Sequence, residues 1–143
     1  MSDQNLRILA VVVLLVHGLG HGGALGALAW IRARPGADTG GWHAARSWLL
    51  PSMTTNAATI VASACWTVAF GGFVIAAFSL WGVLPDAIWR PLSVACALVS
   101  GAGIILFAGT WPLLNTLAAM LVNIAVLIAV LVVSWQPANV AGS

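Results

Sequence analysis

Long apolar runs separated by short polar stretches make up most of this chain. The runs cover about residues 6–31, 57–81, 92–109 and 113–135, and none of them contains an acidic residue. Each run is long enough for the ~20 residues that a helix needs to cross a bilayer. The pattern predicts an all-α, four-helix transmembrane bundle with short loops, a single domain over residues 1–143. The small residues at 27–29 imitate a signal-peptide cleavage site, but the run is longer than a simple signal core, so we expect an uncleaved first span.

The tryptophans give an independent test of this division, because an indole ring prefers the level of the lipid headgroups. Trp66 falls in the middle of a run. The other tryptophans lie at a run end or in a linker: Trp30, Trp42, Trp48, Trp81, Trp89, Trp111 and Trp135. Their distribution is typical of aromatic belts at two membrane interfaces.

Composition and charge support the same interpretation. The chain is 62% hydrophobic and 6% charged, whereas a soluble domain is about 25% charged. Its net charge of +2 is too small to indicate a nucleic-acid partner. Arg32, Arg34 and Arg46 lie in the first linker, and Arg7 and Arg90 lie on the opposite side. The positive-inside rule therefore predicts a cytoplasmic first loop with both termini outside. We expect the membrane to be a bacterial cytoplasmic membrane.

The linker over residues 32–56 is the longest, and Gly40 and Gly41 interrupt regular structure within it. Its segment GWHAARSWLL allows two interpretations. In one, a short interfacial helix turns its indoles and a leucine toward lipid and a histidine and an arginine toward water: Trp42, Trp48, Leu49, His43 and Arg46. In the other, the segment is an ordered polar loop.

Small residues recur every fourth position on two of the predicted helices. The two stripes are Gly18, Gly22 and Gly26 on the first run, and Ser93, Ala97 and Gly101 on the third. In lipid, close backbone approach through small residues drives helix association, so both stripes predict tight helix packing. The alternative is a groove between helices that admits a flat ligand.

His17 and His21 are spaced i, i+4 and project from one face of the first helix. Ionisable side chains inside a membrane indicate a functional site by default. Counting along each helix places Thr67, Ser100 and Asn123 at about the same depth as His17. We expect these side chains to form a polar layer at mid-membrane. The layer either sets the helix register through hydrogen bonds or binds a ligand with His17 and His21.

The two histidines could instead bind a metal ion or a tetrapyrrole. His17 and His21 could share one metal, but the site needs two further ligands, and only Cys65 and Met120 lie near enough. A bis-histidine haem is excluded within one chain, because both histidines come from the same helix. A single axial histidine for a haem or a chlorophyll-type pigment stays open.

The spans contain few other side chains that could react or ligate. Cys65 lies roughly 24 Å along its helix from the second linker and Cys96 only about 6 Å from it, so a disulfide between them is not expected. The available general bases are three histidines, His17, His21 and His43. This scarcity of catalytic groups favours a protein that is not an enzyme.

The segment LRILAVVVLLVHGLGH resembles the opening span of the DoxX-like membrane proteins, with Arg7, His17 and Gly18 at the matching positions. At His21 that family usually carries a different polar residue, and the resemblance covers the first span only. The resemblance implies a small subunit associated with quinone-linked respiratory enzymes or other membrane redox partners.

Two classes of function follow. The first is a non-catalytic accessory subunit of a larger respiratory or photosynthetic membrane complex, in contact with lipids and with other transmembrane subunits or further copies of itself. Quinone, haem or pigment would then be held jointly with a partner in electron transport. The second is a stand-alone binder of a lipophilic or tetrapyrrole ligand through the His17 and His21 face. A small transporter or an enzyme is a more distant third.

Overall fold

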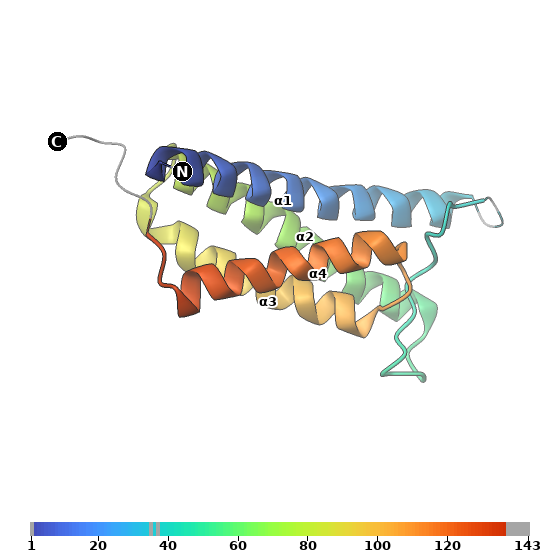
Figure 1. Ribbon diagram of the computed structural model, residues 1–143. Helices are drawn as coiled ribbons and strands as arrows, with labels where there is room; N and C mark the ends of the chain where they lie inside the picture. Colours follow the sequence, from blue (N-terminus) through green and yellow to red (C-terminus); the bar gives the residue numbers. More distant parts are fainter. Residues whose placement is uncertain (1, 35, 37, 137–143) are drawn as a thin grey trace.

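The computed structural model describes residues 2–34, 36 and 38–136, and all regular structure within them is helical. The elements are α1 (Asp3–Ala33), α2 (Thr55–Trp81), η1 (Asp86–Ile88), α3 (Trp89–Leu106), α4 (Leu113–Leu127) and η2 (Ile128–Val132). With η1 and η2 extending α3 and α4, this part of the chain contains 4 helices long and apolar enough to cross a membrane. The predicted helical bundle is confirmed, and its helices alternate in direction along the chain (Figure 1).

Local sequence explains where the helices begin and end. The hydroxyl of Ser2 accepts from the Asn5 amide at the start of α1, and Thr54 caps α2 in the same way. Gly82 ends α2 with a φ of 93°, a left-handed conformation that glycine adopts without strain. The third helix begins at Trp89 rather than at 92, because a proline such as Pro91 fits within a first helical turn. It also ends at Leu106, before the predicted boundary at 109.

The helices pack mainly on their neighbours in sequence, α1 on α2, α2 on α3 and α3 on α4. By contrast, α1 touches α4 only sparsely. The core divides into two apolar clusters, one around Phe73 and Leu80 and one around Trp66 and Phe107. The weak α1–α4 contact leaves space on this side of the bundle.

Glycine packing follows the predicted stripes only in part. A Cβ at Gly18 would lie 3.2 Å from the Phe70 carbonyl oxygen, and one at Gly22 would lie 3.3 Å from the Phe70 ring. Both glycines therefore hold α1 against α2. Gly26 and Gly101 depart from the prediction, since a Cβ at either would meet no atom within 4 Å. The residues around them, such as Ala24, Leu28 and Ser100, are buried, so Gly26 and Gly101 do not lie on the packed faces of their helices.

The closest approach between α2 and α3 involves residues outside those stripes. Gly72 packs directly under the Cys96 sulfur, and a Cβ at Gly103 would lie 3.0 Å from the Cβ of Cys65. Each cysteine thus packs against a glycine of the neighbouring helix, and both thiols are free. Of the predicted α3 stripe, Ser93 and Ala97 are buried.

Between α1 and α2, the described residues 34, 36 and 38–54 contain no helix, so the polar-loop interpretation of GWHAARSWLL is correct. The loop is hydrogen-bonded to the last turn of α3 and to the segment between α3 and α4. The His43 amide donates to the Thr110 carbonyl at 3.0 Å, and the Trp48 indole donates to the Ile105 carbonyl at 2.5 Å. His43, Arg46, Trp48 and Leu49 are exposed, whereas Trp42 is half-buried.

Two tryptophans assigned to the aromatic belts belong to the interior instead. Trp89 is 3% exposed and Trp111 is 8% exposed. Trp111 lies with its ring centroid 5.1 Å from Trp66 and 5.9 Å from Trp42. The sequence places these residues correctly at the ends of the helices, but inward or outward orientation depends on the neighbouring helices.

Candidate functional site

A chain of hydrogen bonds joins α1, α3 and α4 in the interior of the bundle. The Nε2 of His17 donates to Asn123 Oδ1 at 2.9 Å, and Asn123 Nδ2 donates to Ser100 Oγ at 2.8 Å. Ser100 Oγ lies 2.9 Å from His21 Nε2. Asn123, Ser100 and His21 are each at most 1% exposed, so these three members of the hydrogen-bond chain are shielded from the surroundings.

The direction of these bonds assigns the proton positions. Ser100 Oγ accepts from Asn123, and its own hydrogen donates to His21 Nε2, because a His21 proton on Nε2 would leave the Ser100 hydrogen without an acceptor in this network. A neutral imidazole that accepts at Nε2 carries its proton on Nδ1. The Nδ1 of His21 is buried and has no hydrogen-bond partner. The hydrogen-bond chain thus ends at the Nδ1–H of His21, a donor without a partner. A buried donor without a partner lowers the stability of the fold unless an acceptor binds to it.

Aromatic rings enclose the two imidazoles. The His17 and His21 rings meet edge to face, with centroids 4.8 Å apart. The Phe73 ring centroid lies 4.7 Å from that of His17, and the Trp111 centroid lies 5.3 Å from that of His21. These contacts fix the ring orientations, and they come from α2 and from the segment that precedes α4.

Thr67 does not belong to this layer. It is exposed on the outer face of α2, because depth along a helix does not determine which way a side chain points. The contribution of α2 is the Phe73 ring, which sequence reasoning missed. One phenylalanine within an apolar run carries no signal that distinguishes it from an ordinary core residue. The structure therefore brings together His17, His21, Ser100 and Asn123, and leaves Thr67 out.

A groove of about 620 Å³ runs between α1 and α4 beside the histidines. Both His17 and His21 line it, together with Asn115 of α4 and the indoles of Trp42 and Trp111. Its remaining walls are valines, leucines and small residues. The groove is therefore apolar with a few polar groups gathered near one point, as in many small-molecule sites.

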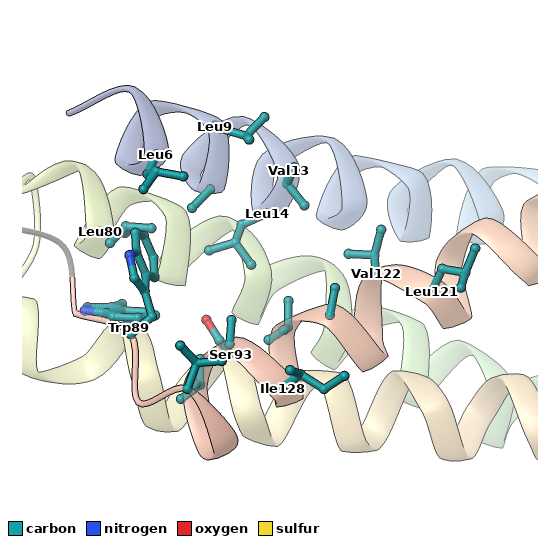
Figure 2. A pocket seen from close by; sticks show the side chains of 17 residues that line it. Leu6, Leu9, Val13, Leu14, Leu80, Trp89, Ser93, Leu121, Val122 and Ile128 are labelled. Atoms are coloured by element: carbon teal, nitrogen blue, oxygen red, sulfur yellow. The ribbon is translucent and has the colours of Figure 1, made fainter. Parts of the chain in front are cut away.

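A second groove of about 810 Å³ continues between the same helices toward the start of α1. Val13 and Val122 line both grooves, so the two adjoin. Figure 2 shows side chains that line it: Leu6 and Trp89 lie toward one end, Leu121 and Val122 of α4 lie toward the other, and Leu14 of α1 and Ser93 lie between them. Ser93 is the polar exception, and its buried hydroxyl has no partner.

The geometry argues against metal or tetrapyrrole ligation through Nε2 of either histidine. The described residues contain no group of three or more His, Cys, Asp or Glu side chains placed to hold a metal. In both histidines Nε2 is hydrogen-bonded to a neighbouring side chain, to Asn123 or to Ser100. Axial ligation through Nε2 would break those bonds. Cys65 packs against Gly103 between α2 and α3 and is not a ligand neighbour of the histidines.

Comparison of the chain with protein-family models, with curated proteins and with solved structures finds no match.

Proposed function

We propose that this chain is an integral membrane protein that binds a lipophilic molecule with a polar head in the two adjoining grooves between α1 and α4. The head lies beside His17 and His21, and the tail lies along the apolar groove. The observation that carries the proposal is the unpaired, buried Nδ1 of His21 on a residue that lines the groove. A ligand acceptor would complete the hydrogen-bond chain that protein side chains leave open.

The size and polarity of the grooves define the ligand further. Volumes of about 620 and 810 Å³ are of the size that holds drug-sized or larger ligands. The described groove walls contain no charged side chain. An uncharged acceptor, such as a carbonyl, suits this environment better than an anion, because a buried charge without a partner is costly. A quinone is one such molecule, and the DoxX-like resemblance of the first span favours it.

A second role, as an accessory subunit of a larger membrane complex, is favoured by the outer face of α4. On α4 and on η2, which extends it, Leu113, Leu117, Ile124 and Leu131 are 71%, 52%, 45% and 59% exposed, and none of them lines either groove. The span Leu113–Val132, which includes α4, is also the least buried of the spans in the described residues, with 22% of an 18-residue stretch buried. This face contacts either lipid or a neighbouring transmembrane helix. The two roles are compatible, since a subunit of a respiratory or photosynthetic complex could bind its lipophile here.

A groove-filling substitution tests the binding proposal. Ala118 lines the groove beside the histidines, whereas Ala64 is exposed on α2. The protein and the variants Ala118→Trp and Ala64→Trp are purified in a mild detergent, and bound lipophiles are extracted and quantified by mass spectrometry. We expect the wild type and Ala64→Trp to retain the same lipophile and Ala118→Trp to lose about nine-tenths of it, a free-energy difference of about 1.4 kcal/mol.

Equal retention by both variants would refute binding in the groove, as would the absence of any retained lipophile from the wild type. His21→Phe separates the roles of head and tail, since it removes the unpaired donor and keeps an aromatic ring. Retention weakened in His21→Phe, with intact folding, supports recognition of the head at Nδ1.

A further inference from the structure

A separate hollow of about 440 Å³ lies at the loop end of the bundle, outside the α1–α4 grooves. It is formed by the first linker and by the segment that joins α3 to α4, and its polar side chains come from His43, Arg46, Ser47 and Thr110. Unlike the two grooves, it contains a positively charged residue, Arg46. None of the roles considered above uses it.

The hollow is built by specific contacts rather than by a chance fold of the loop. The His43 amide donates to the Thr110 carbonyl and joins the two walls, and the Trp48 indole donates to the carbonyl of Ile105 in the last turn of α3. The Ser47 hydroxyl accepts from the Leu50 amide at 3.1 Å and holds the turn that follows Arg46. Ser47 is 2% exposed, which places this turn against the protein interior.

Thr110 supplies an independent sign of a ligand. Its side chain is 2% exposed, and its Oγ1 has no hydrogen-bond partner. A buried hydroxyl without a partner destabilises the fold, so an acceptor that reaches it from the hollow would restore the lost hydrogen bond. With Arg46 close by in the same hollow, the favoured acceptor is an anionic oxygen.

We propose that this hollow binds the phosphate of an anionic membrane phospholipid. Arg46 and Thr110 contact the phosphate oxygens, and His43 lies at the rim. Trp48, Leu49 and Leu50 are exposed beside the hollow at 62%, 45% and 46%, so acyl chains have an apolar surface next to the headgroup. A free phosphate ion would make no use of that surface, which is why the lipid is the favoured source.

Lipid adducts of the detergent-purified full chain test the proposal by native mass spectrometry. Phosphatidylglycerol and phosphatidylcholine are titrated separately, and the preference for the anionic lipid is the ratio of their dissociation constants. We expect Arg46→Gln to lower this preference about fivefold, as for a single exposed ion pair. Thr110→Val, which keeps the side-chain shape, should lower it about threefold.

Arg32→Gln is the matched control, because Arg32 is exposed at the same end of the bundle and does not line the hollow. It should leave the preference unchanged, and melting temperatures should show all three variants folded. An equal loss in Arg46→Gln and Arg32→Gln would mean general charge attraction and overturn the site. Displacement of phosphatidylglycerol by inorganic phosphate at equal concentration would overturn the lipid as its ligand. Ala118→Trp should leave this preference intact, so failure of the groove proposal is separately visible.

Discussion

Asn123 is the residue on which the interior hydrogen-bond chain depends, because its amide accepts from His17 and donates to Ser100. Asn123→Leu keeps the approximate shape of the side chain and removes both bonds. His17 Nε2 then becomes a buried donor without a partner, and Ser100 loses one donor while it keeps its bond to His21. The stability of this variant thus shows whether the hydrogen bonds of the polar layer stabilise the bundle or whether its side chains only fill space.

The expected cost follows from the environment of these bonds. Side-chain hydrogen bonds in membrane proteins contribute about 0.6 kcal/mol on average and at most ~1.7 kcal/mol. A buried donor left unpaired adds about 1–3 kcal/mol. We therefore expect Asn123→Leu to lower the free energy of unfolding by about 2 kcal/mol. His17→Phe in the same background should show a coupling of about 1 kcal/mol with Asn123→Leu.

The measurement is reversible unfolding in mixed micelles, titrated with a denaturing detergent and followed by circular dichroism. Asn115→Leu is the control, because Asn115 lies two turns earlier on α4 and is exposed. It should change the free energy of unfolding by less than about 0.5 kcal/mol. If Asn123→Leu costs no more than Asn115→Leu, or if the coupling to His17 is zero, the hydrogen-bond chain does not stabilise the bundle.

Helix packing gives two further predictions from the same unfolding measurement. Gly72→Ala drives a methyl group into the Cys96 sulfur and should lower the free energy of unfolding by about 1–3 kcal/mol. Cys96→Ala in the same chain should restore much of this stability, and no recovery would locate the strain elsewhere. Gly18→Ala should destabilise by about 1 kcal/mol, because its neighbour includes the rigid Phe70 carbonyl. Gly26→Ala meets nothing and should be neutral or stabilise by up to about 1 kcal/mol; equal costs at Gly18 and Gly26 would contradict the packing shown.

The sequence alone determines the helices and most of their ends. Apolar runs of this length leave few alternatives to helix, because backbone groups away from water must bond within their own segment. The small residues at Gly18 and Gly22 indicate close approach of α1 to another helix, and the structure confirms it. The depths of His17, Ser100 and Asn123 could be counted from the helix ends, since the rise per residue is constant.

Only the tertiary structure decides which way each side chain faces. Thr67 was predicted at the depth of His17, but its side chain is exposed on the outer face of α2. Phe73 is the residue of α2 that packs against the His17 ring. Trp89 and Trp111 turn inward although their positions are typical of an aromatic belt. Rotation depends on how four helices pack together, and in nearly uniform apolar segments the sequence carries little information about it. The unpaired Nδ1 of His21 and the Thr110 hydroxyl, which carry both binding proposals, become visible only once those rotations are set.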